Sequence, residues 1–374
     1  MKPAGRFVIK ECGLITAILF LLLINSAFVH REKTVYSHTG TLVVTFIIFL
    51  IMLICAFNVV KHADRLAEIF GEPYGTLILT LAVISIEVSL IITMMLTGKS
   101  DAKLARDTMF AVIMIAVNGF AGLSLLVGGI KHNRQMYNVE GASAYLAVLI
   151  SLATFCLILP NFTLSTAVGT LSTGQSVLLI LVCSILYLSF LIKQTMTHRD
   201  YFQFSPRYDE NIKKQASSIH SVYYHILLLI IGMIVIITLS KTLAFFLEQS
   251  IETAGLPVKL GGFVIALLVL MPEGFSAIQA AYNNQLQRSI NLCMGSGVAT
   301  ICLTVPAVLI ISLMLRHTLV LGLTPTAMVI LILTFFISLI TFSVRRTSVL
   351  NGMVLLSIFL VYFILIFDQP TSLS

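Results

Sequence analysis

Long apolar segments follow one another along almost the whole chain, and they constrain its fold more than any other feature. A hydrocarbon core about 30 Å thick needs roughly 20 apolar residues for each helical crossing. The sequence therefore predicts an all-α polytopic membrane protein with about 11 transmembrane helices. The predicted spans cover about 13–29, 40–60, 75–97, 108–130, 144–160, 174–193, 222–247, 259–281, 289–314, 319–343 and 349–367.

Composition supports a membrane protein and excludes several other classes. The chain is 58% hydrophobic and only 10% charged, whereas ordinary globular chains carry about 25% charge. Its net charge of +7 comes from Lys and Arg residues in the short gaps between apolar segments, so it does not indicate nucleic-acid binding. The six cysteines form no Cys-x-x-Cys pair. We therefore expect no disulfide framework, no zinc site and no cofactor.

The Lys and Arg residues predict an orientation. With the N-terminus in the cytoplasm, 15 of them fall inside and 8 outside. Because positive residues are retained in the cytoplasm, the predicted topology has its N-terminus inside and its C-terminus outside. The polar connector at 197–221 is then cytoplasmic.

The number of spans predicts an inverted repeat. If residues 1–35 form a leading transmembrane helix, five spans remain in 36–196 and five in 222–374. Because five is odd, the second group enters the membrane upside down relative to the first, a common plan in transporters that places the binding site near the midplane. The predicted architecture is one leading helix followed by two inverted five-helix repeats.

Two glutamates occupy matching places in these repeats. Gly75 lies twelve residues before Glu87, and Gly261 lies twelve residues before Glu273. At 1.5 Å per residue, each glutamate falls about 18 Å into its helix, near the bilayer centre. They are the only two of sixteen acidic residues deep inside apolar spans. A buried glutamate can be a structural hydrogen-bonding residue, but its cost in a membrane makes function the default interpretation.

Other residues near these glutamates are candidates for the same site. Pro272 directly precedes Glu273, and a proline there predicts a helix break or kink that exposes carbonyl oxygens to a cation. Arg106 and Arg288 open the next span of each half. Twelve residues further on stand Asn118 and Thr300.

Two opposed carboxylates imply a mechanism. Oxygen ligands without soft donors suit Ca²⁺, Na⁺, K⁺ or protons. Facing carboxylates in a low dielectric resist being ionised together, so a proton and a metal cation compete for one site. If the site opens alternately to each side, this competition predicts a cation/proton antiporter. The alternatives are an intramembrane enzyme that uses the paired acids and a passive cation channel.

Three sequence runs and a short fourth one carry a family resemblance. They look very like the bacterial ChaA-type calcium/proton antiporters, which also exchange sodium or potassium for protons, in the cation/calcium exchanger superfamily. The resemblance implies a secondary active transporter of the bacterial inner membrane, with no cofactor and with membrane lipid as its surroundings. A homo-oligomer is left open. The runs are RLAEIFGEPYGTLILTLAVISIEVSLI, RDTMFAVIMIAVNGFAGLSLLVGG, LVLMPEGFSAIQAAYNNQLQRSINLCMGSGVATICLTVPAV and RRTSVLNG.

The resemblance also implies roles for particular residues. Glu87 and Glu273 match the two family carboxylates that carry the ion. Ser296 matches a hydroxyl that assists coordination in relatives, and Asn118 and Thr300 match a polar position one turn further. The chain departs from the family pattern at Met114, where a second serine is expected, and at Val83-Ile84 and Val269-Leu270, which replace hydroxyl pairs. The predicted site is thus poor in side-chain ligands and depends more on backbone carbonyls and water.

Overall fold

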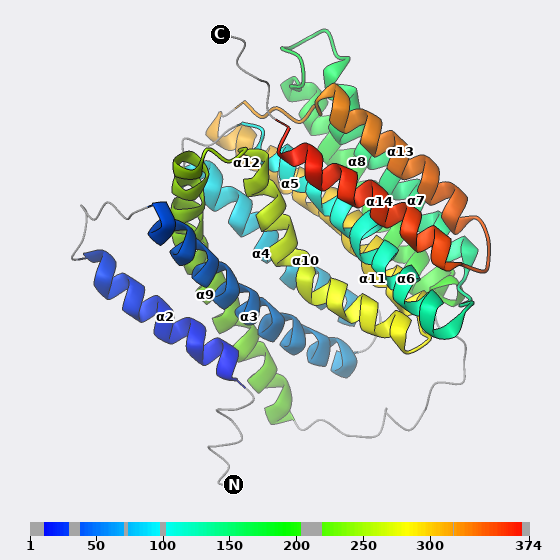
Figure 1. Ribbon diagram of the computed structural model, residues 1–374, viewed down its shortest axis with the longest axis horizontal. Helices are drawn as coiled ribbons and strands as arrows, with labels where there is room; N and C mark the ends of the chain where they lie inside the picture. Colours follow the sequence, from blue (N-terminus) through cyan, green and yellow to red (C-terminus); the bar gives the residue numbers. More distant parts are fainter. Residues whose placement is uncertain are drawn as a thin grey trace. The chain divides into compact units, whose positions relative to one another are not determined.

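A computed structural model of the chain describes residues 11–29, 38–70, 74–97, 102–202, 219–316 and 318–368. Within these ranges nearly all residues are helical (Figure 1), and the strand-type pairing is a single bridge between Met136 and Arg346. The α-helices are α2 (Cys12–Val29), α3 (His38–Phe70), α4 (Tyr74–Thr97), α5 (Leu104–Ile113), α6 (Ala121–His132), α7 (Val139–Ala153), α8 (Thr173–Ile192), α9 (Ile219–Ala254), α10 (Lys259–Tyr282), α11 (Leu286–Ala299), α12 (Val305–Leu315), α13 (Pro325–Phe342) and α14 (Val349–Ile366).

Several spans contain a segment of π-helix, in which each turn is wider than in an α-helix. The span Leu104–His132 runs from α5 through the π-helix η1 (Met114–Phe120) into α6. The span Leu286–Leu315 runs from α11 through the π-helix η7 (Thr300–Thr304) into α12. Two further π-helices, η2 (Thr154–Ile158) and η4 (Lys193–Thr197), follow α7 and α8.

The predicted all-α membrane architecture is confirmed. Among the described residues, nine helices are long and apolar enough to cross a membrane, and shorter apolar stretches lie at Cys12–Leu23 and Thr80–Thr93. Each of these eleven segments overlaps one of the eleven predicted spans. Hydropathy locates these segments because a helix that crosses a membrane satisfies its backbone hydrogen bonds internally and exposes apolar side chains to the lipid.

The tenth span begins later than predicted, at Pro325 instead of 319. The residues before it pair with backbone carbonyls elsewhere: Val320 N–H donates to Ala102 O over 3.1 Å, and Leu323 N–H donates to Leu157 O over 2.8 Å. Proline also disfavours helical conformation in the residue before it, so Thr324 is extended and the helix starts at Pro325.

The chain packs as two compact units, which are described separately. The first unit contains α2, α3, α4 and α9 and corresponds to residues 1–100 and 213–261. Within it, α3 and α9 pack along much of their length. Thr45 Oγ1 lies 2.7 Å from Ser250 Oγ near one end of this pair, and His62 lies against His225 near the other.

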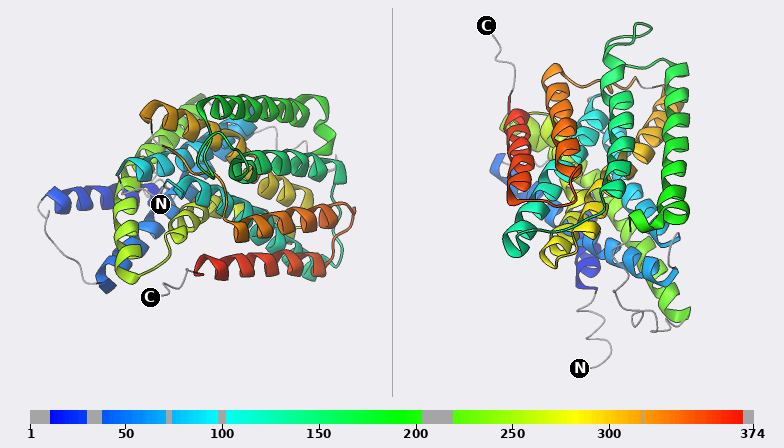
Figure 2. Two further views of the ribbon diagram at one scale, coloured as in Figure 1. Left: turned by 90° about the horizontal axis from the view of Figure 1, so that it is seen from above. Right: turned by 90° about the vertical axis from the view of Figure 1, so that its right-hand side faces the viewer.

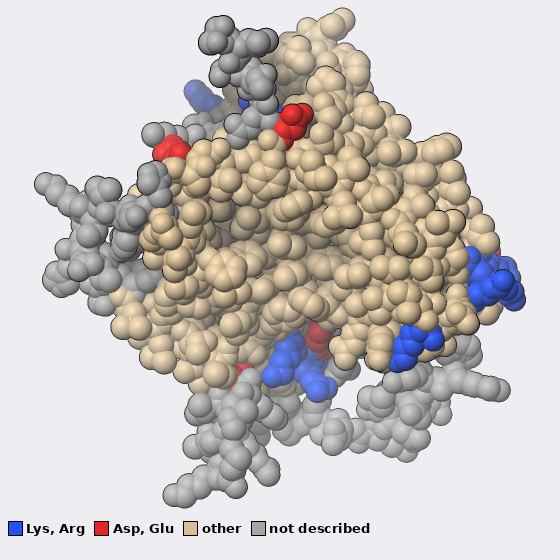
Figure 3. All heavy atoms as spheres, in the orientation of Figure 1, with Lys and Arg blue, Asp and Glu red and all other residues tan. Residues whose placement is uncertain are grey.

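The second unit contains α5–α8, α10 from residue 262 onward and α11–α14, from residues 101–212 and 262–374. In it, α6 and α14 pack closely because glycines bring their backbones together: a Cβ at Gly352 would lie 2.7 Å from Gly122 O. Figures 1 and 2 show α13 and α14 side by side. Neither helix contains a charged residue, and the surface over them in Figure 3 shows no Lys, Arg, Asp or Glu. Val329 and Phe336 are among the exposed side chains of α13.

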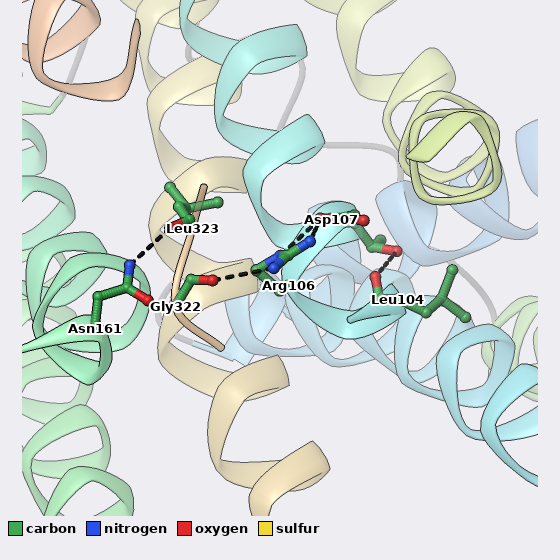
Figure 4. Close-up of polar contacts among 7 residues, drawn as sticks. Leu104, Arg106, Asp107, Asn161, Gly322 and Leu323 are labelled. Atoms are coloured by element: carbon green, nitrogen blue, oxygen red, sulfur yellow. Dashed lines mark hydrogen bonds and ion pairs between the residues drawn. The ribbon is translucent and has the colours of Figure 1, made fainter. Parts of the chain in front are cut away.

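A polar cluster fixes one end of the second unit (Figure 4). The Arg106 guanidinium donates from Nη1 to Gly322 O over 3.1 Å and from Nε to Asp107 Oδ1 over 2.8 Å. Asn161 Nδ2 donates to Leu323 O over 2.7 Å. Arg106 is 5% exposed, so the carboxylate beside it compensates a charge that would otherwise be costly to bury. Together these bonds join the start of α5 and the end of the span that contains α7 to the segment before α13.

The two units do not coincide with the two predicted repeats. The first unit takes α3 and α4 from 36–196 and α9 from 222–374. A repeat is a matter of internal symmetry, whereas a compact unit is a set of helices that pack together. The division into units therefore does not test the repeat boundaries, which stay a prediction. Most of the predicted connector at 197–221 lies outside the described residues, as does the N-terminal part of 1–35 up to residue 10.

Candidate functional site

Both predicted glutamates lie near the middle of their helices. Helices α4 and α10 each contain 24 residues. Counting from Tyr74, Glu87 is the fourteenth residue of α4, and counting from Lys259, Glu273 is the fifteenth of α10. Glu87 is fully buried within the first unit. Glu273 belongs to the second unit, where it is half-buried. Their convergence on one pocket stays a prediction.

Within the second unit, Glu273 lies where several helices meet. The next residue, Gly274, packs against Phe120 at the end of η1 so closely that a Cβ at Gly274 would clash with the ring. The Cys293 thiol of α11 lies near the Glu273 side chain, and Ser124 of α6 lies beside the same thiol. The structure thus brings side chains of α6, η1 and α11 around this part of α10.

Helix α10 is not broken at Pro272, and the kink that the sequence predicts there as the alternative to a break stays a prediction. Helix α10 continues from Lys259 to Tyr282 with Pro272 inside it. Proline removes one hydrogen bond of the helix, but membrane helices tolerate it because neighbouring groups satisfy the freed backbone. Pro272 is buried, and its carbonyl accepts a hydrogen bond from Ser276 Oγ at 3.0 Å. Pro272 therefore lies next to Glu273 without ending the helix.

Asn118 and Thr300, the two positions paired by sequence spacing, both lie in π-helices. Asn118 is inside η1 and is fully buried, and Thr300 is the first residue of η7 and is 2% exposed. Ser296 is half-buried on α11, one turn before Thr300. Short π-helices are rare and occur frequently at functional sites because the wider turn changes the direction of the side chains. Sequence spacing found these positions, but no local pattern predicted the π-helices.

The Asn118 amide has a defined set of partners. Its Nδ2 donates to Thr334 Oγ1 of α13 over 2.9 Å and more weakly to Met114 Sδ over 3.5 Å. The other end of the amide, Oδ1, is buried and has no hydrogen-bond partner within the described part of the chain. A buried acceptor oxygen of this kind can bind a cation.

Sequence reasoning missed the contribution of α13. Thr334, Ser338 and Thr341 recur at the i, i+4 and i+7 positions of this apolar helix, and all three are buried. This spacing places them on one face, and it is the signal that could have found them. The Ser338 hydroxyl is buried without a hydrogen-bond partner among the described residues.

The amide and hydroxyl oxygens described above matter because few charged or imidazole ligands lie near one another in the part of the chain that the structure describes. In the described ranges, no group of three His, Cys, Asp or Glu side chains is placed to hold a metal ion. The side-chain oxygens of the site residues described above in the second unit are the Glu273 carboxylate, the Asn118 amide and several hydroxyls of η7, α11 and α13. Such donors are hard ligands that suit alkali and alkaline-earth cations more than copper or zinc.

Comparison with known proteins identifies the family. The sodium/calcium exchanger protein family matches residues 41–196 and 224–367. The chain is 39% identical to the Sodium-potassium/proton antiporter ChaA of Escherichia coli over 365 residues, which cover 96% of each chain. It is 41% identical to the Putative ionic transporter y4hA of Sinorhizobium fredii, covering 83% of this chain and 84% of the relative.

Solved structures agree on the fold. The structure of native YfkE matches with a TM-score of 0.69 at 18% identity, covering 96% of this chain and 99% of that one. The H⁺/Ca²⁺ exchanger CAX matches with a TM-score of 0.70 at 14% identity, covering 97% and 90%. The resemblance inferred from the sequence is confirmed, and the chain belongs to the sodium/calcium exchanger family as a ChaA-type secondary active transporter, not an enzyme.

Proposed function

We infer that this transporter exchanges Na⁺, K⁺ or Ca²⁺ for protons, and that Glu87 and Glu273 bind the cation or protons in competition. The E. coli relative is named for sodium, potassium and proton antiport, and it matches over nearly the whole chain. A more distant relative from Bacillus subtilis, 25% identical over 58% of this chain, is named a Ca²⁺/H⁺ antiporter. We place Na⁺ and K⁺ first and Ca²⁺ second on this basis.

The observation that carries the proposal is the complete burial of Glu87 in the middle of a membrane-spanning helix. An ionised carboxylate in that position costs several kcal/mol unless a positive charge accompanies it. A proton and a metal cation each remove this cost, but they use the same oxygen lone pairs. Binding one therefore displaces the other, and this competition is what couples their movements.

Neutral ligands complete the proposed site. Asn118 and Thr300 offer an amide and a hydroxyl oxygen from buried π-helical positions, with Ser296 a turn before Thr300 as a supporting hydroxyl. Two carboxylates match the charge of one divalent cation, two monovalent cations or two protons. The same site therefore accepts several cations in exchange for protons, and the neutral oxygens influence which one is preferred.

The proposed setting is the bacterial inner membrane, with the N-terminus in the cytoplasm and the C-terminus outside. The excess of Lys and Arg on the predicted inner side supports this topology. Alternating access between two inverted repeats would carry the neutralised site from one side to the other. Exposed apolar side chains such as Phe336, which is 62% exposed on α13, suit contact with lipid tails or with a second copy of the chain.

The test is transport by purified protein in proteoliposomes. Gradients of Na⁺, K⁺, Ca²⁺ and Mg²⁺ are imposed in turn at several pH values while internal pH and cation content are followed. Antiport predicts saturable proton movement opposite to the cation, and a proton gradient should drive the cation in reverse. Cation flux without proton movement would instead support a channel.

A further inference from the structure

Met114, Asn118 and Thr334 form a closed triangle of polar contacts inside the second unit. Asn118 Nδ2 lies 2.9 Å from Thr334 Oγ1 and 3.5 Å from Met114 Sδ, and Thr334 Oγ1 donates to the same sulfur over 3.6 Å. All three side chains are fully buried. Met114 and Asn118 come from η1, and Thr334 comes from α13.

The sulfur atom determines which way the amide points. A thioether can accept a hydrogen bond but cannot donate one. If the Asn118 amide were reversed, its oxygen would face Met114 Sδ, and two acceptors would meet without a proton between them. With the observed orientation, the amide protons are directed at Sδ and Oγ1. The amide oxygen is then left on the side away from the triangle, buried and without a hydrogen-bond partner among the residues described.

Burying an acceptor oxygen without a partner is unfavourable. A ligand bound to Asn118 Oδ1 would remove this cost. We propose that Met114 and Thr334 are positioning residues that hold the Asn118 amide with Oδ1 directed at the transported cation. This inference rests on the proposed function, because it assigns Asn118 as a cation ligand. It names two residues that act through that ligand without touching the ion.

The inference also accounts for a departure from the family pattern. The sequence places Met114 where a hydroxyl side chain is expected. The structure shows that this position does not simply lose a ligand, because the sulfur contacts the amide one turn further along η1. The Met114 sulfur does not suit a hard cation, but it fixes the direction of the Asn118 amide, whose oxygen does.

The experiment compares Thr334→Val with Thr334→Ser, using initial rates of cation-driven proton movement in proteoliposomes. Valine keeps the shape but removes the hydroxyl, so we expect the half-saturating cation concentration to rise roughly three- to tenfold, the effect of one lost neutral hydrogen bond. The maximal rate should stay unchanged. Serine keeps the hydroxyl and should restore the wild-type value. Met114→Leu should raise the half-saturating concentration in the same way, because leucine no longer prevents reversal of the amide.

The matched control is Thr108→Val, the same substitution at a fully buried threonine of α5 whose hydroxyl donates to Leu104 O over 2.9 Å. It should leave the half-saturating concentration unchanged. A second comparison uses Asn118→Ala, in which the amide is absent: adding Thr334→Val should then have no further effect, since both residues act through one group. Wild-type affinity in Thr334→Val, or an equal effect of this change with and without Asn118, would overturn the inference. Failure of the wild-type protein itself to exchange cations for protons would instead overturn the proposed function.

Discussion

His62 of α3 and His225 of α9 face each other through their Nδ1 atoms, which lie 2.8 Å apart. On its other side, His62 Nε2 lies 3.0 Å from Glu11 Oε2, and Tyr224 OH donates to Glu11 Oε1 over 2.7 Å. The carboxylate can only accept, so His62 donates from Nε2, and in its neutral form its Nδ1 accepts from His225. Glu11 directly precedes α2 and is 2% exposed. It therefore connects the start of α2 to both α3 and α9.

We predict that Glu11 makes the stability of the protein sensitive to acid. Burial alone would raise the pKa of Glu11, but hydrogen bonds from Tyr224 and His62 and the nearby charges of His62 and Lys61 outweigh burial and lower it. A carboxyl with a lowered pKa stabilises the folded state above its unfolded pKa of about 4.3, and this contribution is lost as the pH falls through the folded value. Thermal unfolding in detergent should therefore show a steeper loss of Tm in acid for the wild type than for Glu11→Gln.

The control for this prediction is Glu140→Gln, which changes an exposed carboxyl in the first turn of α7. Its Tm should follow the wild-type pH dependence closely. Glu11→Gln should also have a lower Tm than the wild type near neutral pH, where the carboxylate makes its full contribution. Parallel curves for the wild type and Glu11→Gln would show that this carboxylate does not stabilise α2 in the way proposed.

A second prediction concerns Gly274, which lets α10 approach η1 next to Glu273. A methyl group there would clash with the ring of Phe120, and overpacking of this kind typically costs about 1–3 kcal/mol. Gly274→Ala should therefore lower the Tm and reduce exchange, because it displaces the helix that carries Glu273 from the segment that carries Asn118. Truncating the ring, as in Gly274→Ala combined with Phe120→Leu, should recover part of both losses.

Gly174→Ala provides the comparison for this substitution. Gly174 lies in α8, where an added Cβ meets nothing within 4 Å. Alanine favours helix over glycine by roughly 1 kcal/mol, so this variant should be as stable as the wild type or slightly more stable. If Gly274→Ala behaved like Gly174→Ala, close packing of α10 on η1 would have no part in the function.

The apolar spans could be predicted from the sequence because each crossing has the same length requirement. Their ends could not, since they depend on partners elsewhere in the chain. The residues before Pro325 are extended because Val320 and Leu323 pair with distant carbonyls. Pro272 illustrates a different case: proline removes one hydrogen bond of a helix, but α10 continues through Pro272 to Tyr282.

The candidate site was predicted only as far as its spacing allowed. Matching distances along the two halves identified Glu87, Glu273, Asn118 and Thr300 as related positions. The π-helices at Asn118 and Thr300 were not predicted, because no local residue pattern marked the change from an α-helix to a π-helix. Thr334 was missed because its importance lies in a contact with Asn118 216 residues away. No spacing within one helix can reveal such a contact.

The most direct test of competition at the two glutamates is proton release when a cation binds to purified protein. Calorimetric titration with Na⁺, K⁺ or Ca²⁺ in two buffers of different ionisation enthalpy measures the number of protons released. We predict that the wild type releases protons on cation binding, and that Glu87→Gln and Glu273→Gln each lose both tight binding and proton release. Wild-type affinity with undiminished proton release in either glutamine variant would contradict the account.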